Sequence, residues 1–215
     1  MTGGLMRRQT HAGAALAAAI AGVLLLGCAS PPPERFHTLL ASDSAAPQAR
    51  AGAPIYVDLR PVSVPAQVDH SQWLLRQSDD SLLLLEQDRW AAPLAEELRG
   101  ALASRLAARW GAIDVRGVAI PAAPIWRVRV DVQRFESLPA REARIESTWS
   151  LSSSQRDGPT LVCRHAARAN PAGGDVAALA AAHRQAVTAL ADAIGTQLSA
   201  VAAGGPPGCI KTEQP

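Results

Sequence analysis

Apolar and polar residues alternate along several segments of the chain. The clearest case is 126–132, where Trp126 and three valines occupy every second position and charged residues lie between them. Successive side chains of a strand point to opposite faces, so this pattern predicts a half-buried β-strand with a charged outer face. The segments 72–76 and 82–86 flank the polar turn 78–81 and are expected to form a hairpin. Other alternating or β-rich segments are also predicted to be strands: 36–40, 55–61, 145–151 and 161–167.

Two longer segments show the three- and four-residue spacing of amphipathic helices. The first is predicted to begin near Asp88, whose carboxylate could cap it, to hold Pro93 in its first turn and to stop at Gly111. Its apolar residues recur at four-residue steps: Leu94, Leu98, Leu102, Leu106 and Trp110. The second is predicted to begin at Asp175 and to continue to about Val201. Both helices should pack on one face of a sheet, which gives an α+β fold: a two-layer sandwich with a mixed or antiparallel sheet.

The N-terminal segment has the features of a secretory signal. Basic residues at positions 7 and 8 precede the 15-residue apolar stretch 12–26, which is shorter than the about 20 residues of a membrane-spanning helix. The sequence Leu25-Leu26-Gly27-Cys28 then resembles the lipobox of bacterial lipoproteins, which implies cleavage before Cys28 and acylation of this residue. Two or three acyl chains anchor a protein stably, whereas one does not. A plain signal peptide or a signal anchor is the alternative interpretation.

The expected organisation has four parts. Residues 1–27 are a signal peptide that is removed, and 28–35 are the lipidated cysteine and a short Pro-rich tether. Residues 36–203 form the folded domain, and 204–215 are a C-terminal tail that starts with glycines and prolines. By resemblance to lipoprotein sorting, an alanine rather than an aspartate after the cysteine favours the outer membrane, with the domain facing the periplasm.

Composition then narrows the possible classes of protein. Hydrophobic residues make up 48% of the chain and charged residues 19%, so the chain can bury a core and is not disordered as a whole. Removal of the signal takes two of the 21 basic residues and leaves 19 against 19 acidic residues. A domain that is about neutral lacks the electrostatic character of a nucleic-acid-binding protein, so nucleic acid is not an expected partner.

The sequence offers little for catalysis. It has no G-x-S-x-G elbow, phosphate-binding loop, H-E-x-x-H or C-x-x-C motif. His183 lies on the apolar face of the second helix, where a core imidazole is favoured over a metal ligand. Glu96 and Glu97 point about 100° apart on a helix, so we expect them to be solvated near its positive end. We expect no enzyme activity, metal or cofactor. The other histidines of the mature chain, none spaced as a helical metal ligand, are His37, His70 and His165.

Two cysteines, Cys163 and Cys209, remain once Cys28 carries the lipid. An even pair of cysteines in an oxidising periplasm predicts a disulfide, which would tie the tail to a late strand. The alternative is that Cys163 is a buried thiol and that the thiol of the tail is free.

Tryptophan supplies five of the eight aromatic residues, and two of the five flank a run of leucines. Trp73 and Trp90 lie on either side of the run that contains Leu83, and four successive leucines on a strand place two on each face. Packing under the first helix is the favoured interpretation. The alternative is an exposed apolar patch at Trp73, Leu83 and Trp90 that contacts a partner or serves self-association in a homo-oligomer.

A resemblance to a known family is carried by four segments: 36–39, 55–65, 88–98 and the end of a late strand at 134–135. Together they resemble the ABC-type transport auxiliary lipoproteins, the PqiC family. The most specific is the Trp90-x-x-Pro93-Leu94 element, which opens a helix after the Val- and Pro-rich stretch 61–65. The resemblance covers about 36–201, and the tail with Cys209 lies outside it.

The resemblance implies an outer-membrane lipoprotein that works beside an inner-membrane, MCE-domain lipid-transport assembly. In that family the lipoprotein is accessory, and no chemistry is ascribed to it. The expected function is therefore a non-enzymatic accessory role in trans-envelope transport of a lipid or an organic solvent. The alternative is a structural envelope lipoprotein that assists outer-membrane assembly without a transport partner.

Overall fold

The computed structural model describes residues 32–40, 54–118, 122–154 and 160–209. The chain divides into a unit 1–33 and a unit 34–215, and every described helix and strand lies in the second unit. In chain order these elements are β1 Arg35–His37, β2 Ile55–Leu59, the 3₁₀ helix η1 Ala66–Val68, β3 Gln72–Arg76, β4 Leu82–Trp90, α2 Leu94–Trp110, β5 Ala112–Asp114, β6 Ile125–Leu138, β7 Glu142–Ser153, β8 Leu161–Ala169 and α3 Val176–Ala202.

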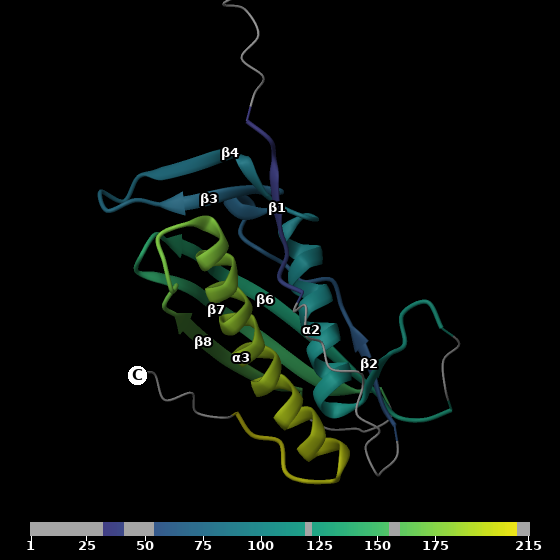
Figure 1. Ribbon diagram of the computed structural model, residues 1–215. Helices are drawn as coiled ribbons and strands as arrows, with labels where there is room; N and C mark the ends of the chain where they lie inside the picture. Colours follow the sequence, from purple (N-terminus) through teal and green to yellow (C-terminus); the bar gives the residue numbers. More distant parts are fainter. Residues whose placement is uncertain (1–31, 41–53, 119–121, 155–159, 210–215) are drawn as a thin grey trace, which may run out of the picture. The chain divides into compact units, whose positions relative to one another are not determined.

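The eight strands of the described residues form two sheets (Figure 1). The larger sheet has the order β5-β2-β6-β7-β8, in which β2 runs parallel to both of its neighbours and β6, β7 and β8 are antiparallel. The smaller sheet has the order β1-β4-β3, with β1 parallel to β4 and β3 antiparallel to it. The predicted α+β class with a mixed sheet is confirmed, although the predicted hairpin pairs with β1 to form a sheet of its own.

Helices α2 and α3 cover one face of the larger sheet (Figure 1). The five α2 side chains predicted at four-residue steps are all buried, including Trp110 at 5% exposure. Strand residues such as Val128 and Trp149 face them from the sheet. The opposite face of the sheet carries no described helix and is polar, because the exposed residues of each strand alternate with the buried ones. None of the helices in the described ranges has the length and apolar character needed to span a membrane.

The ends of the helices follow the sequence signals in part. Gly111 adopts φ 62° and closes α2, and the side chain of Asp175 accepts a hydrogen bond of 2.7 Å from the Ala178 amide at the start of α3. The predicted start of the first helix at Asp88 is wrong. Strand β4 continues through Asp88 because it pairs with β1, and α2 begins only after Pro93.

Strand β6 is longer than predicted. Alternation breaks at Gln133, where the pairing with β7 shifts register between Val132 and Arg134. Beyond this irregularity, burial resumes at Phe135 and Ser137, one position out of phase with the first half of the strand. A search for strict alternation with a period of two therefore ends the strand at such a bulge, although the strand continues beyond it.

Candidate functional site

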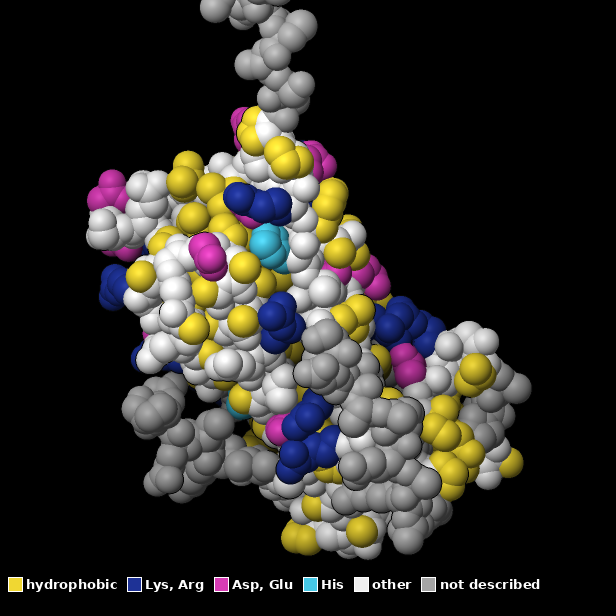
Figure 2. Space-filling view, viewed as in Figure 1, with side chains coloured by type: hydrophobic (Ala, Val, Ile, Leu, Met, Phe, Trp, Pro, Cys, Tyr) yellow, Lys and Arg dark blue, Asp and Glu magenta, His cyan; other side chains and the backbone are white. Residues whose placement is uncertain are grey.

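The hairpin formed by β3 and β4 carries three exposed leucines in succession. Leu82, Leu83 and Leu84 are 46%, 43% and 47% exposed at the start of β4. Since side chains alternate along a strand, Leu83 lies on one face of the hairpin and its two neighbours lie on the other. Figure 2 shows hydrophobic side chains gathered over this part of the surface. The outer half of the hairpin is therefore apolar on both faces.

Trp73 and Trp90 are buried, at 1% and 3% exposure, which removes both from the predicted partner contact. Their rings stack on each other with centroids 4.0 Å apart. Residues distant in sequence cover them, since Trp90 meets Phe135 of β6 edge-on and both rings meet His183 of α3. The two tryptophans are packed in the core as favoured, but β6 and α3 cover them rather than the first helix. Only Leu83 of the three predicted contact residues lies at the surface.

His183 is fully buried among these rings, as the core interpretation predicted. Its Nε2 lies 2.8 Å from the hydroxyl of Ser137, which also accepts a hydrogen bond of 3.1 Å from the indole N–H of Trp73. Burial lowers the pKa of His183 to about 3, so the imidazole is neutral at physiological pH. Within the described ranges, no group of three or more histidine, cysteine or acidic side chains could hold a metal ion.

Asp88 has a different role from the predicted helix cap. It is buried in β4 and accepts two hydrogen bonds from the Arg35 guanidinium, at 2.9 and 2.6 Å. His37 Nε2 lies 2.9 Å from the same carboxylate, so this histidine does have an acidic partner in space. The hydrogen bond from Arg35 is the main reason that the pKa of Asp88 lies below its usual value. Asp88 thus fixes β1, the first element of the folded unit.

Glu97 is also more than a solvated charge at a helix end. Its carboxylate is buried and accepts hydrogen bonds of 2.8 Å from the Leu39 amide and 2.7 Å from the Thr38 hydroxyl. Arg184 of α3 donates to the carbonyl of Thr38 at 3.1 Å. Residues 35–39 are thereby bonded to β4, α2 and α3.

The structure joins Cys163 to Cys209 by a disulfide, with 5.5 Å between the two Cα atoms. This is the pairing that the cysteine count predicted. Cys163 is buried in β8, and Cys209 follows the last turn of α3, so the bond ties the start of the tail to the edge of the larger sheet. Cys28, the predicted lipidation site, lies outside the described residues.

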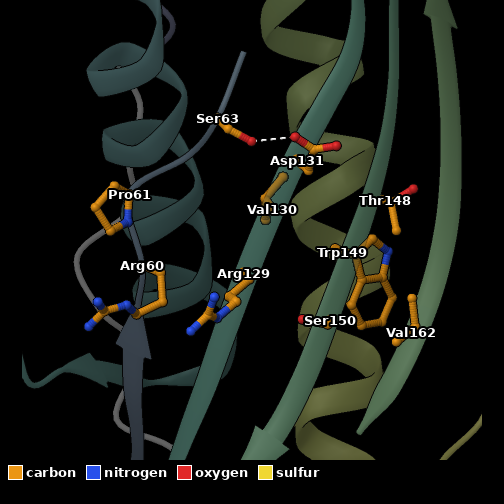
Figure 3. A pocket seen from close by; sticks show the side chains of 10 residues that line it. All are labelled: Arg60, Pro61, Ser63, Arg129, Val130, Asp131, Thr148, Trp149, Ser150 and Val162. Atoms are coloured by element: carbon orange, nitrogen blue, oxygen red, sulfur yellow. Dashed lines mark hydrogen bonds between the residues drawn. The ribbon is translucent and has the colours of Figure 1, made fainter.

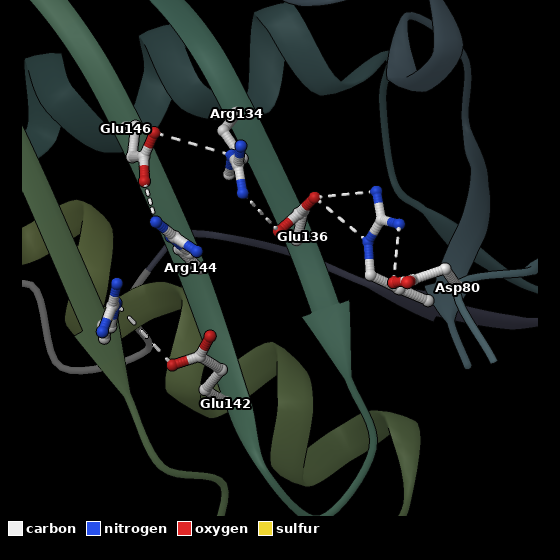
Figure 4. A network of polar contacts seen from close by, with 8 residues as sticks. Asp80, Arg134, Glu136, Glu142, Arg144 and Glu146 are labelled. Atoms are coloured by element: carbon white, nitrogen blue, oxygen red, sulfur yellow. Dashed lines mark hydrogen bonds and ion pairs between the residues drawn. The ribbon is translucent and has the colours of Figure 1, made fainter. Parts of the chain in front are cut away.

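The polar face of the larger sheet is covered by rows of charged side chains (Figure 4). Arg134 contacts Glu136 and Glu146, and Arg144 contacts Glu146 from the same strand. Arg76 of β3 reaches Glu136 at 2.9 Å, which links the hairpin to this network. These contacts neutralise the charges at one end of the face.

The other end of this face is hollowed (Figure 3). The hollow has a volume of about 560 Å³ and lies over β2, β6, β7 and the edge strand β8. Arginines and hydroxyl-bearing residues make up half of its lining, which comprises Arg60, Pro61, Ser63, Arg129, Val130, Asp131, Thr148, Trp149, Ser150 and Val162. The sequence pattern correctly places Arg129 and Asp131 on the charged face of a strand. It does not reveal the order of the strands, which brings these two residues beside Thr148 and Ser150.

The chain belongs to the ABC-type transport auxiliary lipoprotein component family, whose pattern matches residues 37–195. The predicted family is therefore confirmed. The family is one of transport auxiliary lipoproteins and not a class of enzymes. No curated protein matches the chain.

Two solved structures share the fold. An uncharacterized protein superposes with a TM-score of 0.63 at 15% sequence identity, over 78% of this chain and 100% of that protein. Protein XCC0632 from Xanthomonas campestris, assigned to DUF330, superposes with a TM-score of 0.56 at 21% identity, over 78% of this chain and 92% of that protein. At these identities the similarity is one of fold.

Proposed function

We propose that the protein is a lipid-anchored, non-enzymatic accessory component of an MCE-domain transport system, that it is attached to the outer membrane, and that its domain faces the periplasm. The cargo of such a system is a lipid or an organic solvent. Family membership supports the transport role, and the lipobox that ends at Cys28 supports the anchor. The domain holds a partner in place rather than performing chemistry on a substrate.

The observation that carries the partner role is the exposed row Leu82–Leu84. Large apolar side chains that lie together at a surface commonly mark interaction sites. Here they occupy both faces of a hairpin, so a partner can contact the hairpin on two sides. We assign this surface to contact with the periplasmic part of the MCE protein, in place of the two buried tryptophans.

Binding between the purified partners tests this assignment. The full-length lipoprotein in a non-ionic detergent is titrated with the periplasmic part of the MCE protein encoded next to its gene. The wild type should bind, and the double variant Leu83→Asp, Leu84→Asp should bind at least about tenfold more weakly, as expected for central apolar contacts. The matched control is Ile113→Asp on β5, since Ile113 is also a strand residue, 44% exposed, and lies on the other sheet.

Each outcome has a separate meaning once circular dichroism shows that the variants fold. Equal binding by the leucine variant would remove this surface from the proposal. No binding by the wild type at high micromolar concentration would favour the alternative function, a structural envelope lipoprotein without a transport partner. Loss of self-association in the leucine variant, measured by sedimentation, would assign the hairpin to a homo-oligomer instead.

The anchor is tested by mass spectrometry of the protein extracted from membranes. The mature chain should begin at Cys28 with a diacylglyceryl thioether on its sulfur and an acyl chain, such as palmitate, on its amine. Cys28→Ser should abolish both, because the thiol is the atom that is alkylated. Recovery of an unmodified Cys28, or of an intact signal segment, would contradict the lipoprotein assignment.

A further inference from the structure

The hollow on the polar face of the larger sheet has an excess of unpaired positive charge. Most strand arginines of this face have a carboxylate within 4 Å: Arg127 contacts Asp58, and Arg168 contacts Glu142. Arg134 and Arg144 belong to the network of Figure 4. Among the described residues, the side chains of Arg129 of β6 and Arg164 of β8 have no such partner and make no hydrogen bond.

Arg129 lines the hollow, and Arg164 is an exposed residue of the neighbouring edge strand, paired in register with Thr148 of the lining. Strand β7 lies between β6 and β8, and the register places Arg129 opposite Ser150 and Arg164 opposite Thr148. Strands in a sheet are about 4.8 Å apart, so β6 and β8 are separated by about 10 Å. A ligand above the central strand is therefore within reach of both arginine side chains.

The floor between them supplies hydrogen-bond donors. Thr148 and Ser150 line the hollow, and within the described part of the chain neither hydroxyl makes a hydrogen bond. Arg60 lines it from the side of β2, where it pairs with Asp58 at only 3.5 Å. Figure 3 shows the Arg60 and Arg129 side chains extending toward the same end of the hollow.

The carboxylate in the lining is already satisfied. Asp131 accepts hydrogen bonds from the hydroxyl of Ser63 and, at 2.6 Å, from the side-chain amide of Gln133. No ion pair joins it to Arg129 within the described residues, and two arginines, Arg60 and Arg129, line the hollow against this single acid. Pro61 and Val162 add apolar surface to the lining, and Val162 is 58% exposed.

We propose that the hollow binds a phosphate group, held by Arg129 and Arg164 and by the hydroxyls of Thr148 and Ser150. Guanidinium groups bind phosphate oxygens through paired, charge-assisted hydrogen bonds, and hydroxyls donate to the remaining oxygens. A phospholipid headgroup and a free phosphate share this chemistry. The proposal goes beyond the proposed function and needs neither the MCE partner nor the hairpin.

Calorimetric titration of the full-length protein in a non-ionic detergent tests the site. The probes are inorganic phosphate and dihexanoyl-phosphatidylglycerol below its micelle concentration, with dihexanoylglycerol as the control without phosphate. We expect a phosphate probe to bind, the control not to bind, and binding to weaken as sodium chloride is raised. Tighter binding of the phospholipid by tenfold or more identifies a headgroup as the source, and equal or tighter binding of inorganic phosphate identifies a free phosphate.

Variants then locate the binding. The pair Arg129→Gln, Arg164→Gln should reduce affinity at least tenfold, whereas the matched control Arg127→Gln should stay within twofold, because Arg127 already pairs with Asp58. The charge-retaining pair Arg129→Lys, Arg164→Lys is a second variant and should bind more tightly than the Gln pair. No binding of either phosphate probe at millimolar concentration overturns the proposal. Undiminished binding by the Gln pair, or equal loss in Arg127→Gln, overturns it too.

Discussion

The imidazole of His183 lies face to face on the ring of Phe135, with centroids 4.0 Å apart and planes inclined by 10°. Burial lowers the pKa of His183 from 6.5 to about 3, so the folded protein does not bind a proton there under mild acid. The unfolded chain does bind one once the pH falls below about 6.5. The unfolded state therefore holds more protons in this range, and stability must fall as the pH falls from 6.5 toward 3.

We predict that the free energy of unfolding decreases by about 2 kcal/mol between pH 7 and pH 5 through His183 alone. Urea denaturation at a series of pH values measures the decrease. His183→Gln should flatten the curve, with a remainder from His165, whose pKa burial also lowers. Ser137→Ala is the control, because it removes a hydrogen bond but keeps the imidazole and should keep the slope. A slope that His183→Gln leaves unchanged would contradict the prediction.

Two helical glycines should respond to alanine with opposite signs. A Cβ on Gly195 of α3 would lie 2.4 Å from the Trp110 ring, whereas a Cβ on Gly100 of α2 would lie at an ordinary 3.7 Å from a methyl group of Leu40. Gly195→Ala should destabilise the protein by about 1–3 kcal/mol through overpacking. Gly100→Ala should stabilise it by about 0.5–1 kcal/mol, because alanine restricts the unfolded chain and favours the helix. Thermal denaturation of both variants compares the signs, and equal signs would be inconsistent with this packing.

Asp88→Ala should loosen β1. The change removes the acceptor of Arg35 and His37, so we expect the Ala91 amide, which donates to the carbonyl of His37 at 2.8 Å, to exchange about tenfold faster. The stabilisation from the low pKa of Asp88 is present above the ordinary value of 3.8 and is lost as the pH falls through the folded value. Hydrogen exchange followed by mass spectrometry measures the effect.

The control for this prediction is Asp58→Ala. Its partners Arg60 and Arg127 are about half exposed, so its removal should leave exchange near Ala91 unchanged. If the two variants had the same exchange rates near Ala91, the role of Asp88 in holding β1 would be refuted.

The reduced protein, without the disulfide, should be markedly less stable than the oxidised protein. Cys163 and Cys209 are 46 residues apart, and closing a loop of this length restrains the unfolded chain by about 4 kcal/mol in the chain-entropy description. Urea denaturation with and without reductant measures the difference, and Cys209→Ser should reproduce the reduced form. Two free thiols in protein made in the periplasm, detected by alkylation under denaturing conditions, would speak against the bond.

The elements of this fold could be predicted where local signals suffice. The alternation from Trp126, the stop at Gly111 and the cap at Asp175 are each set by a few neighbouring residues. The disulfide followed from the number of cysteines and the compartment. The three-stranded sheet could not be predicted, because it depends on the pairing of β1 with β4, about 50 residues later in the chain.

The sites depend on contacts between distant residues. Trp73 and Trp90 are residues of a type that is common in binding surfaces, but β6 and α3 cover them. The local sequence around the two tryptophans does not indicate that these distant elements bury them. The hollow likewise arises where β6, β7 and β8 come together. The sequence does contain one signal for the hollow, namely the serines and threonines on one face of β7 and the arginines of other strands. That signal can be interpreted only when the order of the strands in the sheet is known.

Strand β1 also determines how mechanical load enters the domain. It is an edge strand of three residues, and a force applied along its axis loads its backbone bonds to β4 together with the Arg35–Asp88 pair in shear. These bonds share the force instead of opening one after another. Because β1 lies at an edge, its detachment would leave the β3–β4 hairpin and the five-stranded sheet paired. Force that reaches the domain through β1 is therefore first resisted by this strand, and the pairing of the other strands does not depend on it.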